Sequence, residues 1–349
     1  MSVEEATVRT IAADVGLRLV PSSYSAVAKS AQFICDKGHT TEKKVSNVIN
    51  NLHSCVLCSF RVSAANIEIS EVVKNLGFDV ELEKKFPGTN KSVDVFVPSA
   101  ALAIDYHGNI WHSSRYISDS NRHAASLKLA ESAGWTYIQV FSDEWLNRKP
   151  QVTSRLAHML GKSLGKVFAR KCEVVEVSYS EAAQFHNTHH VQGASLQGNL
   201  HMALRHEGVL VSVISVGAHM SRRGVKSLDC LELLRYSTST SVVGGLSRLI
   251  AALRNQHSGK TLVTYCDRHM FSGGAYEKVG FALAGITRPD YTYITAGDQT
   301  RRHKSGFQKS RLAKKYGVST EGKTEAQITH ELGLYRVYDC GKSRWTLTL

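Results

Sequence analysis

The sequence predicts a multidomain protein of the α+β class. At about 150 residues per domain, 349 residues correspond to two or three domains, each long enough for its own core. Helical and strand periodicities alternate along the chain behind a cysteine-rich start. Hydrophobic residues at 42% and charged residues at 21% exclude a disordered or fibrous chain. We expect five segments: an N-terminal module at residues 1–62, two larger folded units at 63–150 and 173–298, a basic connector between them at 151–172, and a basic C-terminal tail at 299–349.

Apolar residues do not gather into a stretch that could span a membrane. The longest apolar run, from Gly208 to Ala218, is about half of the roughly 20 residues that a spanning helix needs. The first residues, Met1 to Glu5, are acidic, whereas a signal peptide begins with a basic stretch. We therefore expect a cytoplasmic protein that works without a membrane.

Three of the seven cysteines lie near the start of the chain, next to a histidine. Cys35 and His39 form one short-spaced pair and Cys55 and Cys58 a second, with 15 residues between the pairs. Two such pairs can surround one Zn²⁺ with three thiolates and an imidazole. Because all four ligands come from the protein and so short a module has little core, we expect this zinc to be structural. The alternative is a chance grouping without metal. The remaining cysteines are expected to be small buried hydrophobes: Cys172, Cys230, Cys266 and Cys340.

The segment 63–150 has the pattern helix, strand, strand, helix, strand. The first helix is expected over Ile67 to Leu76 and ends at Gly77. Two short strands joined by a Pro-Ser turn form a hairpin, and the second helix ends before the third strand at a glycine, Gly134. The predicted ranges are 92–98 and 101–107 for the hairpin, 118–133 for the second helix and 136–141 for the third strand.

This hairpin carries unusual polar residues. Asp105 and His107 point the same way because side chains alternate along a strand, and Asp94 lies on the neighbouring strand. Two carboxylates at close range repel each other, so burying both calls for a cation between them, and oxygen ligands favour Mg²⁺. His112 adds a group that exchanges a proton near neutral pH. The alternative is structural, with a turn cap at Asp94 and hydrogen-bonded histidines at a strand end.

The string Ile-Asp-Tyr-His-Gly-Asn-Ile-Trp-His that ends at His112, together with Asp94, resembles the core of the PD-(D/E)xK nuclease superfamily. It is similar to the branch of very-short-patch mismatch-repair endonucleases and related phage homing endonucleases, over residues 64 to 150. The resemblance implies that Asp94 and Asp105 hold Mg²⁺. It also implies that His112 activates the attacking water and that His107, at a position where most of the superfamily has lysine, contacts the scissile phosphate.

The same resemblance extends to two further features. A glutamate of the preceding helix often joins such sites, and we take Glu68 as the expected catalytic member, with Glu71 one helical turn further as the alternative. A module with cysteine and histidine ligands ahead of the nuclease core also looks like the arrangement in phage homing endonucleases. The resemblance therefore implies a phage-encoded protein that acts in the cytoplasm of a bacterial host.

Residues 173–298 form a different unit, with the order β-β-β-α-β-α-β. This order is similar to the N-acetyltransferase (GNAT) fold, and pieces such as Glu232-Leu-Leu-Arg235 look like those of phage Mom-type DNA-modification proteins. The glycine pair before the helix, Gly244-Gly245, could cradle a pyrophosphate. It lacks the leading polar residue and the last small residue of the acetyltransferase loop, and we expect Leu246 to crowd a pyrophosphate there. The alternatives are a fold kept as a DNA-binding platform and an active transferase using Asp267, Arg268 and Tyr276.

The net charge of +13 is concentrated in two windows. Trp145 to Cys172 and Gln299 to Thr320 each hold seven basic residues and no acidic one. Such blocks suit a polyanion, because each cation near a phosphate releases condensed counterions. The alternative is a solvated basic face without a partner, including an amphipathic helix from Phe307 to Tyr316. The residues expected to contact DNA phosphates are Arg148, Lys149, Arg170, Lys171, Arg301, Arg302, Lys304, Lys309 and Arg311.

Together these features predict a site-specific, Mg²⁺-dependent endonuclease of homing type that hydrolyses phosphodiester bonds in double-stranded DNA. The alternatives are a Mom-like DNA-modifying acyltransferase and a non-catalytic DNA-binding protein. One active site cuts one strand, so cutting both would take a homodimer or two successive events.

Overall fold

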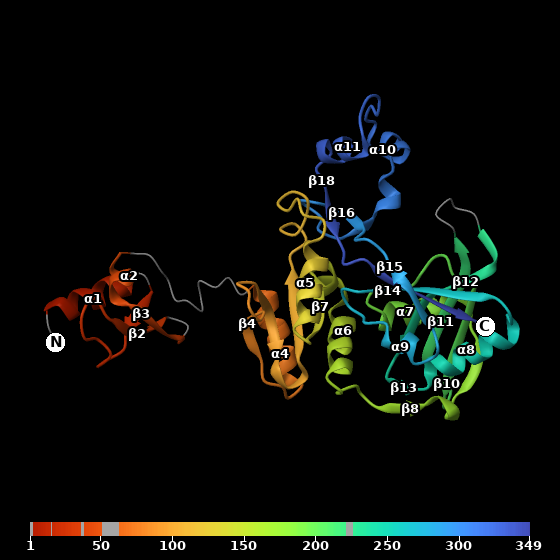
Figure 1. Cartoon of the computed structure of the whole chain (residues 1–349), viewed down its shortest axis with the longest axis horizontal. Coiled ribbons are helices and arrows are strands. Elements are labelled where there is room, and N and C mark those ends of the chain that lie inside the picture. Colours follow the sequence, from red (N-terminus) through yellow and green to blue (C-terminus); the bar gives the residue numbers. More distant parts are fainter. Residues whose placement is uncertain (1–2, 15, 36–37, 51–62, 221–225) are drawn as a thin grey trace. The chain divides into compact units, whose positions relative to one another are not determined.

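The computed structural model describes residues 3–14, 16–35, 38–50, 63–220 and 226–349, which belong to two compact units (Figure 1). The first unit runs from Met1 to Glu68 and the second from Ile69 to Leu349. The division falls inside helix α4 (Ala64–Asn75), a few residues after the boundary expected at 62/63. No helix in the described parts of the chain is long and apolar enough to cross a membrane.

The first unit combines helices with a small antiparallel sheet of order β1-β2-β3. Burial alternates along its middle strand, so that Phe33 is fully buried together with Val8 and Val45 of the helices. These described residues therefore have a hydrophobic core of their own, which the expectation of a metal-stapled module did not include. The elements are α1 (Val3–Asp14), β1 (Leu17–Leu19), β2 (Ser30–Cys35), β3 (Thr40–Lys44) and α2 (Val45–Ile49).

The second unit begins with a four-stranded sheet of order β4-β5-β6-β7. Its first three strands are antiparallel, and β6 and β7 run parallel, which requires the crossover helix between them. The strands expected at 92–98, 101–107 and 136–141 are present as β5, β6 and β7. The additional strand β4, Glu-Leu-Glu-Lys-Lys, has no alternation of buried residues to reveal it. The elements are β4 (Glu81–Lys85), β5 (Ser92–Val97), η1 (Pro98–Ala100), β6 (Leu102–His107), α5 (Arg122–Ser132) and β7 (Thr136–Phe141).

Helix α6 (Ser142–Met159) follows directly on β7 and runs into the segment expected to be a connector. Its backbone is non-helical at Arg148, two residues before Pro150, because proline removes a hydrogen bond and clashes with the preceding turn. The short strand β8 (Lys166–Phe168) then pairs in parallel with β13 (Ser241–Val243). The expected connector is therefore mostly folded structure.

The second sheet has seven strands in the order β15-β19-β14-β12-β11-β10-β9. Only β12 and β14 are parallel neighbours, with helix α8 between them in the chain. The β-β-β-α-β-α-β order expected from the sequence is present, and the hairpin turn lies at Glu207 and Gly208, both at positive φ. The elements are β9 (Glu173–Glu176), α7 (Tyr179–His189), β10 (Leu200–His206), β11 (Val209–Met220), β12 (Lys226–Thr238), α8 (Gly245–Gln256), β14 (Thr261–Asp267), α9 (Gly274–Glu277) and β15 (Ala282–Ile286).

The C-terminal stretch 299–349 is folded and is not a separate tail, so this part of the expected division is wrong. Its last strand, β19 (Lys342–Thr348), lies inside the seven-stranded sheet between β14 and β15. The residues between β15 and β19 form an inserted subdomain, which we call the insertion (residues 287–341). It has its own core around Tyr293 and Leu312, and Figure 1 shows its two helices at one end. Its elements are β16 (Tyr291–Thr295), β17 (Arg302–His303), η3 (Lys304–Phe307), α10 (Lys309–Tyr316), α11 (Glu325–Glu331) and β18 (Leu334–Tyr338).

Candidate metal centre

Asp94 and Asp105 stand opposite each other on the central hairpin of the four-stranded sheet. The neighbouring pair in the register is Val95 with Ile104, so the two aspartates are the next pair along. The backbone N–H of Asp94 donates to Oδ1 of Asp105 over 2.9 Å, and the N–H of Tyr106 donates to Oδ2 of Asp94 over 2.7 Å. The side chains thus replace ladder hydrogen bonds, which fixes both carboxylates at the point where regular pairing ends.

Asp105 is the buried member of this pair. Its second oxygen accepts a short hydrogen bond from the hydroxyl of Tyr137 on β7. Burial raises the pKa of Asp105 to about 6, although the hydrogen bonds from Tyr137 and Asp94 oppose this effect. Asp94 is half-buried at the edge of the same group. The charge of Arg122 also lowers the pKa of Asp105, but its effect is smaller than that of burial.

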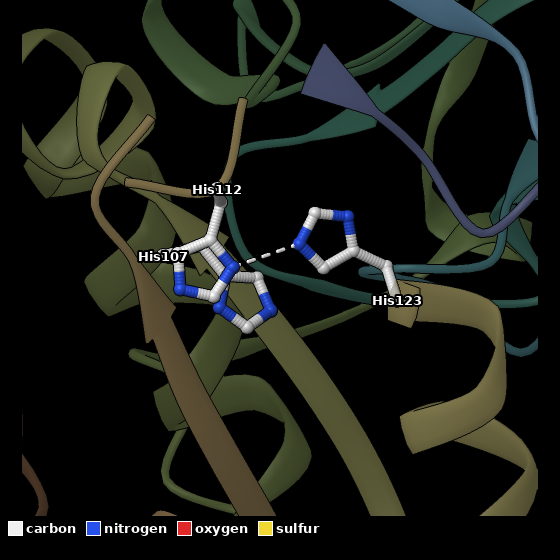
Figure 2. Close-up of side chains that lie close together, drawn as sticks. All are labelled: His107, His112 and His123. Atoms are coloured by element: carbon white, nitrogen blue, oxygen red, sulfur yellow. Dashed lines mark hydrogen bonds between the residues drawn. The ribbon is translucent and has the colours of Figure 1, made fainter. Parts of the chain in front are cut away.

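Three histidines gather at the end of β6, the strand that carries Asp105. His107 ends β6, His112 lies in the loop that follows, and His123 is in the first turn of α5 (Figure 2). One ligand-capable nitrogen from each lies within 4.8 Å of the others, and Nδ1 of His112 is 3.0 Å from Nε2 of His123. The three ring centroids form a triangle, with 4.2 Å between His107 and His112, 4.5 Å between His107 and His123 and 5.3 Å between His112 and His123. His107 and His112 were expected here and His123 was not.

Burial keeps these imidazoles neutral. Burial, with a smaller contribution from the charge of Arg122, lowers the pKa of His112 to about 3 and that of His123 to about 4. His107 is 5% exposed, and its pKa is held well below the usual value by burial first and by the other two histidines next. Neutral imidazoles have an unshared electron pair at one ring nitrogen, so they can accept a proton or bind a metal ion at neutral pH.

The insertion completes this cluster. Nδ1 of His123 donates to the backbone carbonyl of Tyr338 on β18 over 2.5 Å. A carbonyl only accepts, so the neutral His123 carries its hydrogen on Nδ1 and its electron pair on Nε2, which faces His112. The main chain of β18 also reaches the histidine loop through a bridge between Ser113 and Val337.

A second contact between the insertion and the sheet is ionic and involves Arg301. Its guanidinium donates to Asp143 over 2.8 Å and to Glu144 over 2.6 Å, and it lies 4.0 Å from the centre of the Phe141 ring. Burial alone would raise the pKa of Glu144, but Arg301 and His269 hold it at about 2. The expectation that Arg301 contacts DNA is therefore wrong, because its donors are used inside the protein.

The other expected DNA contacts differ in how free their charges are. Arg302 is paired with Asp298, and Lys304 lies 2.5 Å from Asp290. Several others lie against aromatic rings or the backbone: Lys149 over Trp145, Arg170 over Phe168 and Arg148 on the carbonyl of Asn187. Among the nine cations expected to contact DNA, three are exposed and have no ion pair, ring contact or side-chain hydrogen bond among the described residues: Lys171, Lys309 and Arg311.

The expected catalytic glutamate lies on α4. Glu68 and Glu71 are both exposed on this helix, and Glu71 forms an ion pair with Lys74 over 2.9 Å. Glu68 belongs to the first unit by the division of the chain, and Glu71 to the second. The choice between them stays a prediction.

Half of the expected zinc site belongs to the described residues. Cys35 ends β2, and its Sγ lies 3.6 Å from Nδ1 of His39 across the turn to β3. This turn uses Gly38 at positive φ, a conformation that glycine adopts without strain. Cys55 and Cys58 lie outside the described residues, so the four-ligand site stays a prediction.

A second candidate site opens in the seven-stranded sheet. β12 and β14 pair only as far as Leu233 and Thr264, and beyond them a cavity of about 1040 Å³ lies between the strands and α9. Arg235, Asp267 and Tyr276 line it. Burial raises the pKa of Tyr276 to about 12, so its hydroxyl keeps its proton at neutral pH.

A smaller cavity of about 440 Å³ lies at the start of α8, lined by Gly244, Arg170 and Arg248. The expectation that Leu246 crowds this place is wrong, because its side chain is buried in the core of the sheet and points away from the cavity lining. Arg268, another expected active residue, instead binds Glu131 over 3.1 Å and the carbonyl of Cys340.

Among the comparisons with known proteins, solved structures match about half of the chain. No protein-family model matches it, and no curated protein sequence matches it. Among solved structures, an aminoglycoside 6'-acetyltransferase type Ii is similar at 11% identity and a TM-score of 0.28, covering 50% of this chain and 96% of that one. An IAA acetyltransferase from Bacillus cereus is similar at 14% identity and a TM-score of 0.27, covering 51% and 99%. Both solved structures are acetyltransferases, and each match spans about half of this chain and nearly all of the other.

Proposed function

We propose that this chain hydrolyses phosphodiester bonds of double-stranded DNA in a reaction that depends on a divalent metal ion. The observation that carries the proposal is the placement of Asp94 opposite Asp105 on the α-β-β-β-α-β core, with His107 two residues after Asp105 on β6 and His112 in the loop that follows. The finer form of the proposal is site-specific cleavage of the homing type, with structural Zn²⁺ in the N-terminal module.

The donor set fits a hard cation. Asp105 is buried and its pKa is raised to about 6, so a cation beside it would favour the ionised form that the protein alone leaves under-compensated. Mg²⁺ accepts carboxylate oxygens, keeps several waters and stabilises charge on a phosphate oxygen. Asp94 and Asp105 would hold this ion, and the hydroxyl of Tyr137 orients Asp105.

Exposed aromatic side chains beside the cluster favour a nucleic-acid substrate. Trp111, adjacent to His112, is 64% exposed and stacks on Tyr116, which is 53% exposed, at a centroid distance of 4.9 Å. The guanidinium of Arg115 lies 5.4 Å from the centre of the Tyr116 ring. Large exposed rings next to a cation can stack on bases or enter a base step, while the cation contacts phosphate.

The proposal is tested with a pool of duplexes carrying randomised inserts, because the target sequence is unknown. The full-length protein is incubated with Mg²⁺ or with EDTA, and cut ends are captured by adapter ligation. We expect enrichment of a defined sequence with Mg²⁺ only. Asp94→Asn and Asp105→Asn should each abolish the captured ends, and Asp79→Asn, an exposed aspartate before β4, should not. Equal end capture with EDTA would contradict the proposal.

The second candidate function is acyl transfer to DNA, the alternative to which the acetyltransferase comparisons relate. The observation that favours it is the cavity between β12 and β14, with the protonated hydroxyl of Tyr276 in its lining and a second, arginine-lined cavity at the start of α8. The test is binding of acetyl-coenzyme A, followed by transfer of a labelled acetyl group to DNA. Tyr276→Phe should reduce transfer and leave cleavage unchanged. If neither activity is found and the chain still binds double-stranded DNA, the third alternative, a DNA-binding protein without catalysis, is favoured.

A further inference from the structure

We propose that His107, His112 and His123 form a binding site for one first-row transition-metal ion such as Zn²⁺. Their ligand-capable nitrogens lie within 4.8 Å of one another, and Figure 2 shows the three rings gathered between the end of β6 and the start of α5. The site is distinct from the carboxylate pair of Asp94 and Asp105 in its donor atoms and from the N-terminal cysteines in its place in the chain.

The first argument is an unsatisfied atom. Nε2 of His107 is buried and makes no hydrogen bond with any described residue. A buried polar atom without a partner is costly, and such atoms in folded proteins usually mark a missing water or ion. The other two imidazoles contact the ring of His107, with centroids 4.2 and 4.5 Å away, and each offers a ligand nitrogen within 4.8 Å of one of His107.

The second argument is the hydrogen bond behind His123. A metal-binding histidine usually donates its other ring N–H to a carbonyl or carboxylate, which fixes its tautomer and orientation. His123 donates from Nδ1 to the carbonyl of Tyr338, so the electron pair on Nε2 points at His112, 3.0 Å away. Two ligand nitrogens of a tetrahedral ion with bonds of about 2.0 Å are about 3.3 Å apart, close to this distance.

The third argument is the choice of metal. Imidazole nitrogen suits Zn²⁺ and its first-row neighbours, whereas Mg²⁺ prefers oxygen ligands. Three protein ligands leave the fourth tetrahedral position open for water, as in catalytic zinc sites. This inference deepens the proposed function by giving the nuclease centre an imidazole-bound metal, and it depends on that function only for the role of the open position.

The experiment measures metal binding and needs no activity. The full-length protein is stripped with a chelator and titrated with Co²⁺ and with Zn²⁺ by calorimetry and visible absorption. We expect the wild type to bind one equivalent more than His123→Ala, His112→Ala or His107→Ala, with at least about a 100-fold loss of affinity at this site in each. The matched control is His330→Ala, an exposed histidine at the end of α11, which should bind as the wild type does.

The N-terminal ligands give an internal reference. Cobalt bound to thiolates absorbs in the near ultraviolet, and this band should be the same in all variants, whereas a site of three imidazoles contributes only weak visible bands. His123→Gln, with unchanged circular dichroism, serves if an alanine variant fails to fold. Equal stoichiometry and affinity in the wild type and the folded His123 variant would overturn the inference. In that case His112 and His123 share a hydrogen bond. Metal binding without DNA cleavage would instead reject the proposed function and keep the site.

Discussion

The four-stranded and the seven-stranded sheets of the second unit use one geometric device in two ways. Each has a single parallel pair of strands, β6 with β7 and β12 with β14, and each places polar groups next to it. In the four-stranded sheet the polar side chains contact one another and are largely buried. In the seven-stranded sheet the strands separate beyond Leu233 and Thr264 and leave a cavity of about 1040 Å³. The first arrangement suits small ions, and the second suits a large ligand.

Two aspartates show the difference in charge balance. Asp267 in the second sheet is buried, but Lys342 lies 3.1 Å away, and this cation and His269 lower the pKa of Asp267 against the effect of burial. Asp105 in the first sheet has hydrogen-bond donors and no such ion pair within the described chain, and burial raises its pKa to about 6. A buried carboxylate that the protein neutralises needs no ion. A buried carboxylate that it leaves uncompensated marks the place where an ion fits.

The largest change in stability is expected when the ion pairs between the insertion and the start of α6, directly after β7, are broken. Arg301→Met leaves Glu144 and Asp143 without their shared cation, and breaking a buried ion pair costs about 3–5 kcal/mol of the free energy of unfolding. Arg302→Met, which breaks an exposed pair with Asp298, should cost at most about 1 kcal/mol. Urea denaturation of both variants measures the difference. Equal losses would contradict the assignment of Arg301 to the interior.

Acid should weaken the seven-stranded sheet through His186. Both of its ring nitrogens are hydrogen-bonded to serines, Ser237 at 2.7 Å and Ser215 at 2.8 Å, and burial lowers its pKa to about 4. Because the folded state favours neutral His186 over the protonated form, its pKa is lower in the folded state than the value of 6.5 in the unfolded state. This preference contributes its full stabilisation above pH 6.5. This stabilisation is lost as the pH falls toward 4 and amounts to about 3 kcal/mol in total. His186→Asn should therefore have a flatter dependence of unfolding free energy on pH between 6.5 and 4. An unchanged slope would contradict this role.

The next effect separates the DNA-binding contributions of the two sheets. Trp111→Ala should weaken binding to double-stranded DNA by about 1–3 kcal/mol, the range expected when a stacked base loses its aromatic partner. Tyr179 is an exposed aromatic residue at the start of α7, the helix that follows β9 of the seven-stranded sheet. Tyr179→Ala should change the affinity little. Fluorescence anisotropy on one duplex at fixed salt measures both. Equal losses would show that the surface near His112 is not the DNA contact.

The smallest effect concerns the exposed cations of α10. Lys309→Glu with Arg311→Glu should flatten the slope of log affinity against log salt by about 0.9 for each phosphate contact that is lost. The loss should be similar on specific and random duplexes, because phosphate contacts do not read sequence. A slope equal to that of the wild type would show that this part of the insertion is a solvated surface.

Local pattern was enough to predict the hairpin and its polar residues. Alternation and a Pro-Ser turn locate β5 and β6, and the side-chain period of two brings Asp105 and His107 to one side. Strand β4 could not be found in this way, because its charged residues do not alternate with buried ones. The same reasoning predicted five strands of the seven-stranded sheet, β10, β11, β12, β14 and β15, but not the short strand β9 at its edge.

Contacts between distant parts of the chain could not be predicted from local pattern. His123 is bound to Tyr338, 215 residues later, and Arg301 to Glu144, 157 residues earlier. A basic window in the sequence looks the same whether its arginines face solvent or a buried acid, so Arg301 was assigned to DNA. The last strand, β19, lies inside a sheet that begins at residue 173, and nothing in its own sequence shows this partner.

Capture of cut DNA ends by the full-length protein, with Mg²⁺ or EDTA, tests the central claim most directly. The account predicts Mg²⁺-dependent ends at one enriched sequence for the wild type, for Asp79→Asn and for Tyr276→Phe. It predicts at least about a 100-fold loss for Asp94→Asn and for Asp105→Asn, the order expected when a charge-stabilising ligand is removed. Cleavage that persists in both aspartate variants, or is lost in Tyr276→Phe alone, would contradict the placement of the active site on the four-stranded sheet.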